Sequence, residues 1–286
     1  MGFRTVVVNT RCKLELKLNY LVCRGDEIQR IFIDEISTLI IHSTAVAVTS
    51  ALLSELIKHN VKIIFCDEKH NPSAELLPYF GSYNNALKLR QQISWNETTK
   101  QLAWTDIVVK KITNQAKLLL KRGKTSQAEQ LMQYVEQVQI NDLSNREGHA
   151  AKVYWSAMFN KGWSRNCGDF YSKALNYGYT ILLSTFNREI AKCGYLTQLG
   201  IWHENQYNDF NLSCDMMEVF RPVVDEIVID LKENDENFKS KLVAMQERKV
   251  KIDGKEMYLE NAIEVYIRSV LSALNTNNIS GILNYE

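Results

Sequence analysis

The apolar residues change their spacing near residue 76, and this change limits the possible folds more than any other feature of the chain. Residues 13–22 alternate between polar and apolar side chains, which predicts a strand with one apolar face. The β-branched runs Thr5–Val8, Ile28–Ile33 and Thr38–Ile41 predict further strands. The beginning of the chain is therefore predicted to be rich in β-structure.

A single helix is predicted inside this β-rich part. Residues 46–59 carry their apolar side chains at helical spacing, and Val61–Cys66 then returns to an extended apolar run. Pro72 and Pro78 follow this run. Because proline disfavours the continuation of a helix or a strand, the segment around these two residues is predicted to link two domains.

From about residue 82 the apolar spacing is helical almost to the end of the chain. The residues from Leu175 to Ile190 follow this spacing, and Gly194 is suited to a left-handed helix terminus. Lys251–Lys255 predicts a β-hairpin turn within this helical part. The predicted fold class is α+β: a small β-rich domain, residues 1–76, precedes a larger and mainly α-helical C-terminal domain, residues 77–286.

Charge and cysteine content exclude several classes of protein. The formal net charge is +1, from 34 Lys and Arg against 33 Asp and Glu, so any DNA-binding surface must arise from local clustering of cations. The six cysteines form no C-x-x-C pair, which argues against a zinc ribbon and favours reduced thiols. No run approaches the ~18 apolar residues of a membrane span. We therefore expect a cytoplasmic protein without a membrane partner.

The first segment with possible chemistry is the sequence SNREGHAAKVY, residues 144–154. In a helix, Glu147, Ala150, Ala151 and Tyr154 lie along one face, and the small alanines allow another element or a substrate to approach the carboxylate. Ser144 and Glu147 also match a capping box, in which Glu147 serves only to cap the helix. Taken alone, the segment favours the helix-capping role for Glu147 over a role in a functional site.

The second segment, GYLTQLGIWH, places His203 directly after a short connection bracketed by two glycines, Gly194 and Gly200. Imidazole binds metals and transfers protons near neutral pH, although an isolated histidine is more often structural.

The third segment, CDMMEVFRP, places Asp215, Glu218 and Arg221 three residues apart, on one helical face. A solvated Glu–Arg ion pair explains this spacing equally well. The apolar residues around the two acids favour function, because a carboxylate in apolar surroundings needs a cation or hydrogen bonds to stay charged. Pro222 is expected to end or kink this helix, or to open the next one.

In order, REGHAAKVYW, GYLTQLGIWH and CDMMEVFRPVVD resemble the signature of the Cas1 family of CRISPR-associated integrases, closest to its type II-A branch. The resemblance covers essentially the whole chain and implies that its helical domain is catalytic. It implies that Glu147, His203 and Glu218 are the catalytic metal ligands, with Asp215 an accessory or alternative carboxylate. Some relatives carry aspartate at both acidic positions of the third motif, which leaves open which of the last two acids binds metal directly.

The resemblance also implies an activity and partners. The activity is metal-dependent insertion of new spacers, by attack of a protospacer 3′-hydroxyl on repeat phosphodiesters. Two carboxylates and an imidazole suit Mg²⁺ or Mn²⁺. The implied partners are double-stranded protospacer and leader–repeat DNA, a second copy of the chain in a homodimer, and a Cas2 dimer bridging two such dimers into a heterohexamer. Csn2 and Cas9 are further partners on the same footing.

Contacts to the DNA phosphates are expected from cations near the three motifs. The residues predicted for this role are Lys152, Arg165, Arg188 and Arg221, and further positive charge comes from Lys88, Arg90, Lys110 and Lys111.

Two other functions remain open from the sequence. A stand-alone, structure-specific and metal-dependent DNA endonuclease would use the same ligands with water as the nucleophile. A non-catalytic dimeric scaffold would make Glu147 a helix cap and Glu218 part of a surface ion pair.

Overall fold

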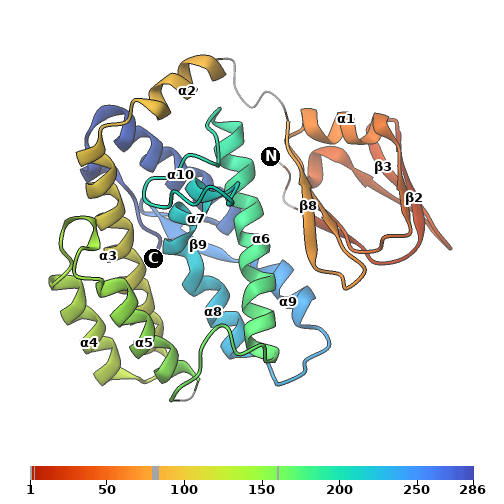
Figure 1. Ribbon diagram of the computed structural model, residues 1–286. Helices are drawn as coiled ribbons and strands as arrows, with labels where there is room; N and C mark the ends of the chain where they lie inside the picture. Colours follow the sequence, from red (N-terminus) through yellow and green to blue (C-terminus); the bar gives the residue numbers. More distant parts are fainter. Residues whose placement is uncertain (1, 3, 79–83, 160) are drawn as a thin grey trace. The chain divides into compact units, whose positions relative to one another are not determined.

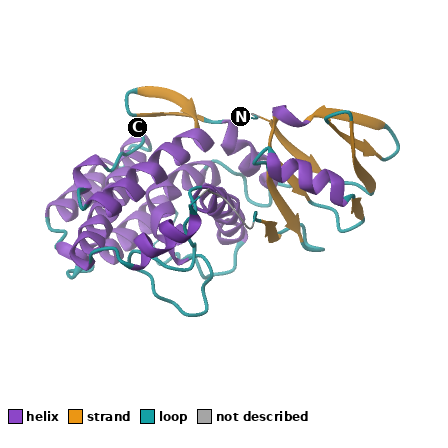
Figure 2. Ribbon diagram, turned by 90° about the horizontal axis from the view of Figure 1, so that it is seen from above, coloured by secondary structure: helices purple, strands orange, loops and turns teal. Residues whose placement is uncertain are grey.

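The computed structural model describes residues 2, 4–78, 84–159 and 161–286, and it divides into two compact units, Met1–Tyr79 and Phe80–Glu286. Strands predominate in the first unit and helices in the second (Figure 2). The predicted fold class is thereby confirmed. The division between the units follows Tyr79, whereas the sequence analysis placed it after residue 76.

The first unit contains two four-stranded sheets and one α-helix that share an apolar core. In one sheet, β1, β5 and β7 run parallel and β8 pairs antiparallel with β7; in the other, the order is β4-β3-β2-β6. Leu52 and Leu56 of α1 are fully buried in the core. The elements are β1 (Arg4–Val8), β2 (Cys12–Lys17), β3 (Tyr20–Arg24), β4 (Ile28–Phe32), η1 (Ile33–Glu35), β5 (Ile36–Ile41), β6 (Val46–Val48), α1 (Ser50–Lys58), β7 (Lys62–Cys66) and β8 (Pro72–Leu76).

The prediction of one strand over residues 13–22 was wrong, because this segment forms the hairpin of β2 and β3. Its two-residue turn consists of Leu18 and Asn19, both with positive φ, at 49° and 66°. Two positive φ values are the geometry of the tight hairpin turn. Leu18 is 84% exposed as a result, whereas Leu14 and Leu21 are fully buried.

Two further boundaries differ from prediction. The helix predicted over residues 46–59 begins only at Ser50, because Val46–Val48 pairs with β2 and the Thr49 side chain caps the helix by accepting a hydrogen bond from the Leu52 N–H. Pro72–Leu76 is an edge strand and not part of a linker, since proline is tolerated as the first residue of an edge strand. Residues 79–81 of the predicted linker lie outside the described residues.

In the second unit, α7 and α8 lie between the long helices α3 and α6 (Figure 1). Trp104, Phe186, Phe220 and Tyr266 are the largest side chains buried there, together with Tyr154. The elements are α2 (Asn85–Ile93), α3 (Glu97–Lys121), α4 (Thr125–Glu136), η2 (Ile140–Asp142), α5 (Arg146–Met158), α6 (Phe170–Lys192), α7 (Asn211–Met217), η3 (Glu218–Phe220), α8 (Arg221–Ile229), α9 (Phe238–Val243), η4 (Ala244–Glu247), β9 (Lys249–Ile252), β10 (Lys255–Tyr258), α10 (Leu259–Thr276) and η5 (Ile279–Gly281).

Two predicted backbone features of this unit are confirmed. Asp253 and Gly254 have positive φ and form the turn between β9 and β10, and Gly194 has φ 85° after the end of α6. None of the helices in the described ranges is both long enough and apolar enough to cross a membrane.

Candidate metal centre

Glu147 lies in the first turn of α5, but it does not cap that helix. Asn145 is the N-cap residue and accepts a hydrogen bond from the Gly148 N–H at 3.3 Å, while Asp142 accepts from the N–H groups of Arg146 and Glu147. These contacts satisfy the amide groups at the helix start. The capping-box interpretation of Ser144 and Glu147 was therefore wrong, and the Glu147 carboxylate is available for other contacts.

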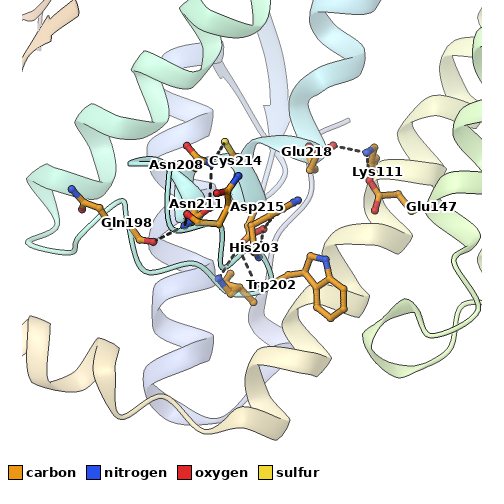
Figure 3. Close-up of polar contacts among 12 residues, drawn as sticks. Lys111, Glu147, Gln198, Trp202, His203, Asn208, Asn211, Cys214, Asp215 and Glu218 are labelled. Atoms are coloured by element: carbon orange, nitrogen blue, oxygen red, sulfur yellow. Dashed lines mark hydrogen bonds and ion pairs between the residues drawn. The ribbon is translucent and has the colours of Figure 1, made fainter. Parts of the chain in front are cut away.

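Lys111 of α3 joins Glu147 to Glu218, two acids that are distant in sequence (Figure 3). Its ammonium nitrogen forms an ion pair with Glu147 Oε1 and lies 2.5 Å from Glu218 Oε2. Burial lowers the pKa of Lys111, but attraction to Glu218 and Glu147 outweighs that effect, and the pKa is raised overall. The lysine therefore stays charged between two carboxylates.

Glu218 is held from the other side by Arg221. The Arg221 Nε donates to Glu218 Oε1 at 2.7 Å, and the side chain of Glu218 is only 7% exposed. Burial raises the pKa of Glu218, yet the Arg221 and Lys111 cations more than compensate and lower it to about 2. Pro222 opens α8 immediately after this pair, so the third motif turns through η3 and does not continue as one regular helix.

Arg221 also contacts a network of tyrosine and acidic side chains that are buried. Its guanidinium lies over the Tyr179 ring, 4.5 Å from the centroid, and that of Arg165 lies 4.6 Å from the same ring. The hydroxyl groups of Tyr179 and Tyr154 both donate to the Asp225 carboxylate. Burial raises the pKa of Asp225 to about 6, although the two tyrosine hydrogen bonds act in the opposite direction.

This raised pKa predicts a pH-dependent stability difference between wild type and Asp225→Asn. Because the folded-state pKa of Asp225 exceeds its unfolded value, the contribution of Asp225 to the stability of the wild type falls as the pH rises from about 4 to about 6. The free energy of unfolding of Asp225→Asn should therefore rise relative to wild type by on the order of 3 kcal/mol over this range. Urea denaturation of both proteins at several pH values measures the difference, and a constant difference would contradict the assignment.

His203 is oriented by Asp215, which is fully buried. His203 Nδ1 lies 2.5 Å from Asp215 Oδ1, and the Asp215 carboxylate also accepts hydrogen bonds from the N–H groups of Ile201 at 2.6 Å and Trp202 at 2.9 Å. The hydrogen bond to Asp215 raises the pKa of His203 most, and Glu218 and Glu147 raise it further. Asp215 is thus fully engaged in holding the histidine and its loop, whereas Glu218 points toward Lys111 (Figure 3).

The loop that carries His203 packs so tightly that it requires glycine at position 200. A Cβ atom on Gly200 would lie 2.4 Å from the His203 carbonyl oxygen and 2.8 Å from Asp215 Oδ2. Gly200→Ala should therefore reduce the free energy of unfolding by about 1–3 kcal/mol, because backbone atoms must move. Thermal or urea denaturation measures the loss. Gly281→Ala is the matched control, since a Cβ there meets nothing within 4 Å, and equal effects of both substitutions would contradict the argument.

The donor set suits a divalent cation. Within the ranges that the structure describes, no three acidic, histidine or cysteine side chains already converge as a metal site. Lys111 instead occupies the space between Glu147 and Glu218. Glu218 Oε2 is buried against the Lys111 ammonium, 2.5 Å away, so this oxygen becomes available as a ligand only when that ammonium moves. Two carboxylates and the imidazole, with its Nδ1 fixed by Asp215, are ligands that Mn²⁺ and Mg²⁺ accept.

The cations predicted to contact DNA have different surroundings. Lys152 is exposed on α5. Arg165 and Arg221 both contact the Tyr179 ring. The Arg188 side chain is 12% exposed and its guanidinium pairs with Glu189 and Glu260, so a phosphate contact would require these ion pairs to open.

The sequence analysis did not single out Lys111 from the other basic residues. The sequence pattern nevertheless marks Lys111 as a buried lysine, because it lies on the same helical face as Trp104, Val108 and Leu118, all of which are buried. A lysine within an apolar stripe must have an acidic partner, and this marks it as part of a site.

Comparison with known proteins identifies the family. The family model for CRISPR associated protein Cas1 matches residues 5–261. A CRISPR-associated endonuclease Cas1 from Neisseria meningitidis serogroup C (strain 8013) is 33% identical over 235 residues, which cover 82% of this chain and 77% of the relative. The chain therefore belongs to the Cas1 family.

Solved structures show the same fold over almost the whole chain. A casposase bound to integration product has a TM-score of 0.78 at 19% identity and covers 97% of this chain and 92% of its own. A Cas6-RT-Cas1–Cas2 complex has a TM-score of 0.72 at 18% identity, covering 98% of this chain and 36% of that one.

Proposed function

We propose that this chain is a metal-dependent DNA integrase of CRISPR adaptation, which joins a protospacer 3′-hydroxyl to phosphodiesters of the repeat. The observation that carries the proposal is the pairing of Glu147 and Glu218, from separate helices, across a single buried cation. The names of similar proteins support it, since one relative is an endonuclease and one structure contains an integration product.

The chain's own residues suit this chemistry without a covalent protein intermediate. Glu147 and Glu218 would hold Mg²⁺ or Mn²⁺, and His203 would complete the ligand set or move a proton through Nε2. The bound cation would lower the pKa of the attacking hydroxyl and neutralise charge on the phosphate. Asp215 acts as the positioning residue of His203, through contacts with its ring and with the backbone around it.

The partners proposed are double-stranded protospacer and leader–repeat DNA, a second copy of this chain, and a Cas2 homologue. A Cas1–Cas2 complex among the similar structures supports the Cas2 partner. Assembly of two homodimers and a Cas2 dimer into a heterohexamer, contacts with Csn2 and Cas9, and membership of the type II-A branch rest on the motif resemblance.

A strand-joining assay tests the function. Purified chain, with and without a Cas2 homologue, is mixed with a leader–repeat target and with a short duplex that has free 3′-hydroxyl ends and strands labelled at their 5′ ends, in Mn²⁺, Mg²⁺ or chelator. A metal-dependent product longer than the labelled strand is the expected result. Shortened strands without joining would indicate the stand-alone endonuclease, and DNA binding without any reaction would indicate the scaffold.

A further inference from the structure

Lys111 balances the charge of the candidate metal centre before any metal enters it. The two carboxylates of Glu147 and Glu218 face two cations, the Lys111 ammonium and the Arg221 guanidinium. The formal charge of these four groups is therefore zero, and the cluster is compatible with its burial. The Lys111 ammonium is a common partner that holds the two acids near each other.

The position of Lys111 is fixed by the helix that carries it. The side chain of Lys111 is only 11% exposed, and the neighbouring Ile107, Val108 and Ile112 are buried. One turn further along α3, Asn114 donates to the Val219 carbonyl oxygen at 3.0 Å, which ties this helix to the residue after Glu218. The ammonium is therefore held at the carboxylates by a rigid element and has little access to solvent.

Adding a divalent cation to this arrangement disturbs its charge balance. The four groups and the metal together then carry a formal charge of +2 in a largely buried place, and like charges at short range repel strongly where the dielectric constant is low. A phosphodiester brings negative charge to the same place and offers the Lys111 ammonium a new partner. The negative charge of the DNA phosphate therefore offsets the positive charge that the metal adds, and the metal offsets the charge of the phosphate.

We propose that Lys111 makes divalent-metal binding dependent on DNA: its ammonium competes with the metal for Glu147 and Glu218, and a DNA phosphate releases it. This inference rests on the proposed function, because it takes those two acids as metal ligands. Coupling of this kind is reciprocal, so the metal also tightens DNA binding by the same factor. Competition from Lys111 thereby restricts divalent-metal binding to the complex with DNA.

The experiment measures Mn²⁺ affinity and not activity. The full chain is titrated with Mn²⁺, free Mn²⁺ is followed by electron paramagnetic resonance, and binding to DNA alone is subtracted. Each titration is run without DNA and with a leader–repeat duplex whose 3′ ends lack hydroxyl groups, so that no joining occurs. The variants are Lys111→Met and, as matched control, Lys121→Met, which removes an ion-paired lysine from the same helix.

We expect Lys111→Met to bind Mn²⁺ without DNA at least about tenfold more tightly than wild type, and DNA to tighten its binding correspondingly less. Lys121→Met should behave as wild type. Equal or weaker Mn²⁺ binding by Lys111→Met in the absence of DNA would overturn the inference. If Lys111→Met does not fold, the Mn²⁺ affinity of the wild type, measured with and without DNA, tests the inference. DNA should tighten Mn²⁺ binding by the wild type by at least about tenfold, and a smaller effect overturns the inference.

A third variant separates this inference from the proposed function. Glu147→Gln keeps the size of the side chain but removes its charge, so it should bind Mn²⁺ more weakly than wild type with DNA present. Wild-type affinity in Glu147→Gln would contradict the metal site itself. Loss of affinity in Glu147→Gln together with unchanged affinity in Lys111→Met would refute only the role of Lys111.

Discussion

Glu147→Ala is expected to reduce metal-dependent strand joining by about 10³-fold, because it removes a carboxylate that would hold the divalent cation at the reacting centre. The carboxylate is 29% exposed, and Lys111 keeps Glu218 as its partner, so the fold should survive the substitution. The rate of joined-product formation in Mn²⁺ measures the effect, and circular dichroism checks the fold.

The matched control for this substitution is Glu136→Ala, which removes an exposed glutamate at the end of α4. That variant should join strands at the wild-type rate. If Glu147→Ala joins strands as fast as Glu136→Ala does, then Glu147 is not a catalytic residue and the proposed site is wrong.

Trp104→Ala should cause the largest loss of stability, about 3–5 kcal/mol, because it empties a large buried volume in α3. Trp104 is 2% exposed, stacks on Trp202 with ring centroids 5.7 Å apart, and meets the His203 ring edge-on at the same distance. Urea denaturation measures the loss of free energy of unfolding.

Trp202→Ala is the comparison variant, because it removes the same stacking contact with Trp104 but empties less buried volume. Trp202 is 43% exposed, so its removal should cost clearly less stability than that of Trp104. A loss below about 1 kcal/mol for Trp104→Ala would show that the His203 loop does not depend on this packing.

The order of the elements was predictable because apolar spacing records which face of each element is buried. The prediction was wrong where local turn geometry overrides that spacing. The alternation over residues 13–22 continues through Leu18 although the chain reverses there, and only Asn19 hinted at the positive φ of the turn. Pro72 was assigned to a linker because the sequence does not show that its strand lies at an edge.

The candidate site was only partly predictable. Resemblance to a family selected Glu147, His203 and Glu218, and their role as metal ligands stays a prediction. Sequence spacing placed Asp215 and Glu218 on one helical face, whereas the structure gives them different partners, His203 and Lys111. Local spacing could not show this, because α3 supplies Lys111 from more than thirty residues before Glu147 in the sequence.

Glu147, Glu218 and His203 are proposed to bind one divalent cation. The most direct test is anomalous diffraction from crystals grown with Mn²⁺ and a leader–repeat duplex without 3′-hydroxyl groups. We expect a manganese peak in contact with both carboxylates and with His203 Nε2, and a Lys111 ammonium that has left at least one of the two acids. A duplex-bound structure with no manganese peak at these residues, or with Lys111 still bridging both carboxylates, would contradict it.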